Sequence, residues 1–128
     1  MSFFDGFSTF NFDEGTPYVS ITKNGVTFNK GVVMKMKCPT KVVLLMNDQT
    51  KQIAIKACSA FEENSTDFYN GDKKNNVFSV RWNGRDLLNT LQNMMGWCLD
   101  IVSYRVQGTL IPEESAMLFD LTQATILK

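Results

Sequence analysis

The main pattern along the chain is a series of short alternating segments separated by turns. In residues 17–22, apolar and polar side chains alternate, which predicts a half-buried strand. The Asn24-Gly25 pair that follows is a strong signal for a tight turn, and residues 26–28 are again β-formers. The sequence therefore predicts an N-terminal β-hairpin.

A short helix and a second hairpin are expected next. Asn29 is a favourable N-cap for a helix over residues 30–37, and Pro39 prevents that helix from continuing. Residues 41–46 and 52–56 then have the composition of two strands, and a polar turn joins them. The first half of the chain is thus expected to contain two hairpins separated by one helix.

The second half shows the same order of elements. Residues 77–82 alternate as a strand, and Asn83 stands where an N-cap is expected. Residues 85–95 form an amphipathic helix pattern, which Gly96 ends as a C-cap. The hairpin strands predicted after it are residues 101–110 and 116–121.

The two halves also match partly in residue type. Five positions recur after a constant shift of 54, namely Val26, Phe28, Asn29, Val33 and Met34 as Val80, Trp82, Asn83, Leu87 and Leu88. With a longer second helix allowed, residues 41–46 correspond to 102–107 and residues 53–57 to 117–121. We predict an α+β domain of two strand–helix–hairpin repeats. Because units this small cannot bury their own apolar surface, the two repeats are expected to pack on each other as a pseudo-two-fold, swapped-hairpin-like barrel.

This interpretation divides the chain into four parts. A β-β-α-β-β module over residues 17–58 and a β-α-β-β module over residues 77–128 are separated by a polar linker, residues 59–76. Before them lies an arm, residues 1–16, with five phenylalanines among Gly, Ser, Asn and acidic residues. So many aromatic side chains are expected to lie against the domain or against a second subunit.

Composition argues against most catalytic and metal chemistry. The chain has no histidine, the commonest general base and metal ligand. Its three cysteines, Cys38, Cys58 and Cys98, are expected to be buried reduced thiols, with a disulfide or a metal site as the alternative. No phosphate loop, nucleophile elbow or dinucleotide fingerprint is present. We therefore expect a protein that is not an enzyme and that holds neither metal nor cofactor.

Charge is balanced overall but uneven along the chain. The formal net charge is zero, yet seven lysines lie between Lys23 and Lys56, where Asp48 is the only acid. Such a basic region is typical of either a phosphate-binding surface or a solvated polar face. No apolar run is long enough to cross a membrane, and no signal peptide pattern is present, so a cytoplasmic location is expected.

The order of elements resembles a known DNA-binding family. Residues 26–29, the helix at 31–37 and the strand pair 43–45 and 53–56 look like a diverged SpoVT-AbrB module, in which two copies interlock as a swapped-hairpin barrel. Members of that family are dimeric or tandem transcriptional regulators that bind DNA through basic residues on the interlocked strands and loops. Carried across by position, this resemblance implies DNA-binding roles for Lys23, Asn24, Lys30, Lys35, Arg81 and Arg85.

Two functions remain open from the sequence. The first is a transcriptional regulator that binds double-stranded DNA through a basic face of the first module. The alternative is a non-catalytic interaction or assembly module, of phage or mobile-element origin, which forms a homodimer through its Phe-rich arm. Convergence of Lys23, Lys30, Lys35 and Lys41 on one face would favour nucleic acid, whereas their scatter would favour protein interaction.

Overall fold

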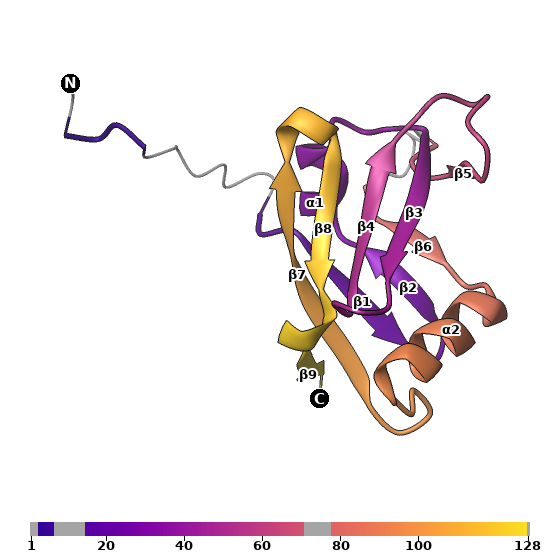
Figure 1. Cartoon of the computed structure of the whole chain (residues 1–128). Coiled ribbons are helices and arrows are strands. Elements are labelled where there is room, and N and C mark those ends of the chain that lie inside the picture. Colours follow the sequence, from indigo (N-terminus) through magenta and orange to yellow (C-terminus); the bar gives the residue numbers. More distant parts are fainter. Residues whose placement is uncertain (1–2, 7–14, 71–77, 128) are drawn as a thin grey trace.

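The protein folds as a curled antiparallel sheet with a short helix at either end (Figure 1). The computed structural model describes residues 3–6, 15–70 and 78–127. The sheet follows the path β5-β3-β4-β8-β7-β1-β2-β6, and β9 pairs with β7 outside this path. Two α-helices accompany it within the described residues, so the fold is a mixed α/β half-barrel.

The predicted N-terminal hairpin is present, and it continues into the second half of the chain. Strands β1 (Tyr18–Thr22) and β2 (Gly25–Phe28) pair across the expected tight turn. The free edge of β2 then pairs with β6 (Val80–Trp82), a segment more than 50 residues away. We refer to the pair of β2 and β6 as the central ribbon.

Helix α1 (Lys30–Lys35) begins where the sequence predicts and ends two residues early. The side chain of Asn29 caps it by accepting a hydrogen bond from the backbone N–H of Val32 (3.1 Å). Lys37 and Cys38 adopt positive φ angles of 64° and 56°, so the chain has already left the helix before Pro39.

Strands β3 (Lys41–Asn47) and β4 (Gln52–Ala57) form the second predicted hairpin. The next strand, β5 (Thr66–Asp67), lies inside the segment expected to be a polar linker and pairs with the first two residues of β3. Phe68 follows it and is only 7% exposed, so this segment contributes to the core.

Helix α2 (Arg85–Met95) has the predicted bounds, and Gly96 ends it in the left-handed conformation (φ 69°). Its N-cap is Gly84 and not Asn83, and no side chain caps the first turn. The last part of the chain comprises β7 (Ser103–Ile111), the 3₁₀ turn η1 (Pro112–Glu114), β8 (Ala116–Asp120), the 3₁₀ turn η2 (Leu121–Gln123) and β9 (Thr125–Leu127).

The long strand β7 joins the two sides of the curled sheet. Its first part pairs with β1, and its residues from Gly108 onward pair with β8. A Cβ atom at Gly108 would lie 2.9 Å from side-chain atoms of Met117 and Phe119, so only glycine lets these two residues pack against the strand.

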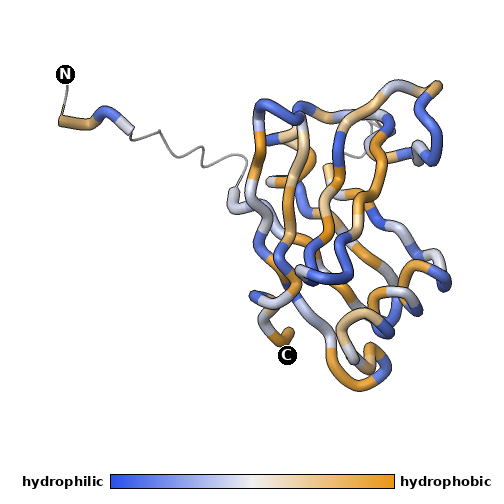
Figure 2. Tube along the Cα trace, viewed as in Figure 1, coloured by the Kyte–Doolittle hydropathy of each residue, from blue (hydrophilic) through white to orange (hydrophobic). Residues whose placement is uncertain are grey.

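The concave side of the sheet holds the core. Its largest fully buried side chains include Phe28, Phe119, Ile21 and Ile55, and apolar segments follow the strands through the body (Figure 2). The three cysteines are free thiols, but none of them is buried: Cys38 and Cys58 are half-buried and Cys98 is exposed, so the expectation of buried thiols is wrong. Within the described residues, no helix has both the length and the apolar character to cross a membrane.

Candidate nucleic-acid interface

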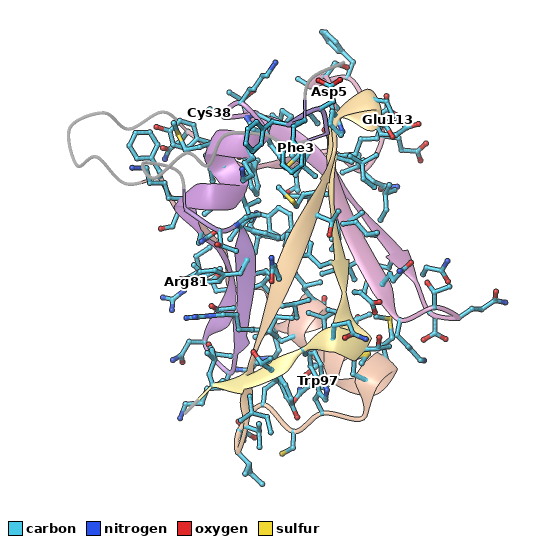
Figure 3. The ribbon with its side chains drawn as sticks, turned by 90° about the vertical axis from the view of Figure 1, so that its left-hand side faces the viewer. Phe3, Asp5, Cys38, Arg81, Trp97 and Glu113 are labelled. Atoms are coloured by element: carbon cyan, nitrogen blue, oxygen red, sulfur yellow. The ribbon has the colours of Figure 1, made fainter. Side chains whose placement is uncertain are left out.

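A row of outward-facing side chains crosses four adjacent strands. Ser20 of β1 lies opposite Arg105 of β7 and Thr27 of β2, and Thr27 lies opposite Arg81 of β6. Because neighbours alternate along a strand, buried Val19 and its equivalents face the core while these four face outward. Arg81 and Arg105 are exposed, and Figure 3 shows Arg81 projecting away from the sheet. We call these four residues the outer row; strand spacing gives it a span of about 14 Å.

One end of the central ribbon carries Lys23, Asn24 and Arg85. Together with side chains of α2 they line a polar pocket of about 290 Å³. The approach depends on Gly25, which has φ 148° and where a Cβ atom would lie 2.7 Å from the carbonyl oxygen of Trp82. Glycine therefore lets the β1–β2 turn pack directly against the end of β6, from which α2 begins.

Asp100 lines the same pocket, so the pocket contains both positive and negative side chains. This carboxylate makes the pocket itself a poor receptor for a free anion. Lys23 and Arg85, in contrast, are exposed at this pocket.

The other end of the ribbon carries Lys30. Its Nζ lies 5.4 Å from the centroid of the Phe78 ring, just before β6. Asn29 fixes this position, because its side chain accepts from the backbone N–H of Tyr18 (3.0 Å) and donates to the carbonyl of Thr16 (2.8 Å). Strand β2, which lies between Asn24 and Lys30, has four residues and spans about 10 Å at about 3.4 Å per residue.

The cations of the ribbon differ from the other lysines in their partners. Lys41, Lys51 and Lys56 form ion pairs with Asp67, Asp48 and Glu114. Among residues 3–6, 15–70 and 78–127, no such ion pair involves Lys23, Arg81, Arg85 or Arg105. Arg105 instead lies over the Tyr18 ring at 4.0 Å. Within the described residues, these four cations therefore differ from Lys41, Lys51 and Lys56 in having no carboxylate partner.

The structure separates the residues that the sequence suggested. Lys23, Asn24 and Arg85 come together at one end of the ribbon, Arg81 lies at its centre and Lys30 at the other end. Lys35 is half-buried in the last turn of α1, outside this surface.

The four lysines whose convergence would favour nucleic acid do not lie on one face. Lys23 precedes β2, and Lys30 follows β2 as the first residue of α1. Lys35 is the last residue of α1, and Lys41 of β3 forms an ion pair with Asp67 of β5. This scatter is the arrangement expected for protein interaction, and it counts against a nucleic-acid face built from those lysines. The candidate surface is instead the central ribbon with Arg81 at its centre. Arg105 lies in the same outer row, and the sequence did not suggest it because only the pairing of β7 with β1 brings it there.

Comparison with known proteins finds no family model, curated protein or solved structure that matches this chain. In the described part of the chain, no group of three or more Cys, Asp or Glu side chains is arranged to hold a metal ion.

Proposed function

We propose that this protein is a DNA-binding transcriptional regulator that contacts the phosphates of double-stranded DNA through the central ribbon. The observation that carries the proposal is the position of the exposed side chain of Arg81 at the middle of the central ribbon. Lys23 and Arg85 flank it at one end, and Lys30 flanks it at the other. Cations spread along the ribbon suit the regular spacing of backbone phosphates better than they suit a small anion.

The pairing within the ribbon supports the proposed swapped-hairpin arrangement. Val26 lies opposite Trp82, and Phe28 lies opposite Val80. Residues separated by 54 positions thus exchange places across the pair, as a two-fold axis through Thr27 and Arg81 would require.

Strands β4 and β8 show the same kind of reciprocal pairing on the other side of the half-barrel. Ile53 lies opposite Phe119, and Ile55 lies opposite Met117, so here the residues that exchange places are 64 positions apart. The centre of this second pair is Ala54 with Leu118.

The hairpin turns agree with the same relation. The N–H of Leu121 donates to the carbonyl of Lys51, and the N–H of Ala57 donates to the carbonyl of Ser115, both at 3.0 Å. Lys51 and Ser115 are again 64 positions apart and both have positive φ, at 58° and 51°. These contacts support two interlocked copies of one unit, with the central ribbon lying on their common axis.

The test is fluorescence anisotropy of a labelled DNA duplex titrated with protein at several salt concentrations. With four phosphate-contacting cations, we expect the logarithm of the association constant to fall with a slope of about −4 against the logarithm of salt concentration. Arg81→Ala, and separately Lys23→Ala/Lys30→Ala, should weaken binding several-fold and reduce this slope by about 1 for each cation removed.

Two matched controls remove the same charge elsewhere. Lys51→Asn removes a cation from the far hairpin turn while keeping a residue that tolerates positive φ. Lys35→Ala removes the suggested residue that lies outside the ribbon. Neither should change the slope. Salt-insensitive affinity, or an equal loss in all variants, would overturn the proposal.

A further inference from the structure

The curled sheet does not close into a complete barrel. Strands β5 and β6 end its path, and within the described residues no ladder of backbone hydrogen bonds joins them. Their contact consists of the Trp82 Nε1–H, which donates to the carbonyl of Asp67 (3.1 Å), and of rings such as Phe68 and Trp82, whose centroids are 6.0 Å apart. A seam therefore separates the two edge strands.

This seam contains an apolar opening. It is a groove of about 480 Å³ lined mainly by Leu44, Asn64, Thr66, Arg81, Trp82 and Leu87. We call it the seam groove. The lining combines the apolar side chains of Leu44, Trp82 and Leu87 with the positive charge of Arg81, a composition that suits a peptide with aromatic and acidic residues.

One side of the seam is an incomplete strand edge. Strand β5 pairs only with Lys41 and Val42, so among the described residues nothing pairs with the outer edge of β3 beyond them. Met46 lies opposite buried Ile53 yet is 39% exposed, and Leu45 is 49% exposed. An exposed apolar edge of this kind is a template for another extended segment.

The Phe-rich arm has the complementary chemistry. Residues 1–16 hold five phenylalanines, three acids and no base. The first base of the chain is Lys23, which leaves 13 bases against ten acids in the rest of the molecule. Phe3 and Phe4 are 86% and 64% exposed in the single chain, so their apolar surface remains available for burial.

Residues 3–6 of the arm lie on the side of the molecule away from the groove (Figure 1). Pro17 accepts a backbone hydrogen bond from Gly108 of β7 (3.0 Å), and Figure 1 shows residues 3–6 on the side of β7, with β5, β6 and α2 on the opposite side. We propose that the seam groove of one copy binds the Phe-rich arm of a second copy, in a reciprocal exchange that forms a homodimer. This inference goes beyond DNA binding and does not depend on it.

Sedimentation velocity over a wide concentration range tests the exchange. The full chain should shift from monomer to dimer as its concentration rises. Phe3→Ser/Phe4→Ser should raise the dimer Kd by at least about tenfold, because aromatic anchors dominate such interfaces. Both residues are exposed, so this variant should keep its fold. Phe61→Ser, which removes a ring that is 98% exposed outside the arm, is the matched control and should dimerise like the parent.

A mixing experiment shows which surfaces meet. Leu87→Asn alters the groove, so this variant alone should dimerise as weakly as the arm variant. When it is mixed with Phe3→Ser/Phe4→Ser, the two should form a heterodimer, because one intact arm then meets one intact groove. If Leu87→Asn does not fold, a labelled peptide of residues 1–16 replaces it and should bind the Phe3→Ser/Phe4→Ser protein, whereas a scrambled peptide should not.

Three outcomes would overturn the inference. The parent could stay monomeric at every concentration, the arm variant could dimerise as well as the parent, or the mixed variants could fail to associate. A monomeric parent whose Trp82 emission shifts when the arm is altered would place the arm on its own body instead of on a second copy. Each result is independent of whether the monomer binds DNA.

Discussion

The turn between β1 and β2 depends on a glycine that a side chain would disturb in two ways. Gly25 has φ 148°, and an added Cβ atom would lie 2.7 Å from the carbonyl oxygen of Trp82. We expect Gly25→Ala to lower the free energy of unfolding by about 2 to 3 kcal/mol, because backbone strain and a backbone clash add. Urea denaturation followed by circular dichroism measures the change.

The matched control is Gly84→Ala. Gly84 has φ −63°, and an added Cβ atom would meet nothing within 4 Å. Gly84→Ala should lower the free energy of unfolding by less than about 1 kcal/mol, the usual difference between glycine and alanine at an N-cap. Equal losses at the two glycines would mean that the β1–β2 turn does not pack against β6 as described. The surface formed by Lys23, Asn24 and Arg85 would then also lack its structural basis.

At the scale of single elements, two asparagines that look alike in sequence have different roles. Asn29 and Asn83 both precede a helix, but only Asn29 caps one. Its side chain makes three hydrogen bonds, to Val32, Tyr18 and Thr16. We expect Asn29→Ala to cost about 2 kcal/mol of stability and Asn83→Ala to stay within about 0.5 kcal/mol, as measured by thermal or urea unfolding.

If Asn83→Ala lowered the free energy of unfolding more than Asn29→Ala, the assignment of the two N-caps would be wrong. It would also place the N-cap of α2 at Asn83, one residue earlier than described. Because α2 begins directly after β6, the position of Arg85 relative to the ribbon would then change as well.

Local patterns predicted the elements better than their partners. The apolar period and Gly96 correctly bound α2, and the Asn-Gly signal correctly places the first turn. The repeat alignment places residues 41–46 against 102–107, a shift of 61, and residues 53–57 against 117–121, a shift of 64. Leu44 pairs with Ile55 and Gly108 with Phe119, so the two hairpins have matching registers at a shift of 64, and only the first of these alignments is three residues out. Helix length between the repeats obscures such a register, because periodicity carries no information about distant strands.

The same reason explains which site residues could be predicted. Lys23 and Asn24 belong to a turn that short-range signals identify, and Arg85 follows from the start of a helix. Arg105 joins Arg81 only through the chain of pairings β7–β1–β2–β6. No local feature of the sequence indicates that order of strands.

For the whole molecule, the segment expected to be a linker helps to hold the half-barrel together. Phe68 lies between the two edge strands, with ring centroids 5.4 Å from Phe28 and 6.0 Å from Trp82. It is 7% exposed, whereas Phe61 in the same segment is 98% exposed. We expect Phe68→Ala to lower the free energy of unfolding by about 3 kcal/mol, since it removes a ring shared by both sides of the seam.

Phe61→Ala is the control, and it should change stability by less than about 0.5 kcal/mol. A loss near 3 kcal/mol is a large fraction of the stability of a typical domain, so Phe68→Ala should also unfold at visibly lower denaturant concentration. If instead the two variants unfold alike, residues 59–70 do not pack against the central ribbon. The seam groove, which Thr66 and Asn64 help to line, would then not exist in the form that binding of a second copy requires.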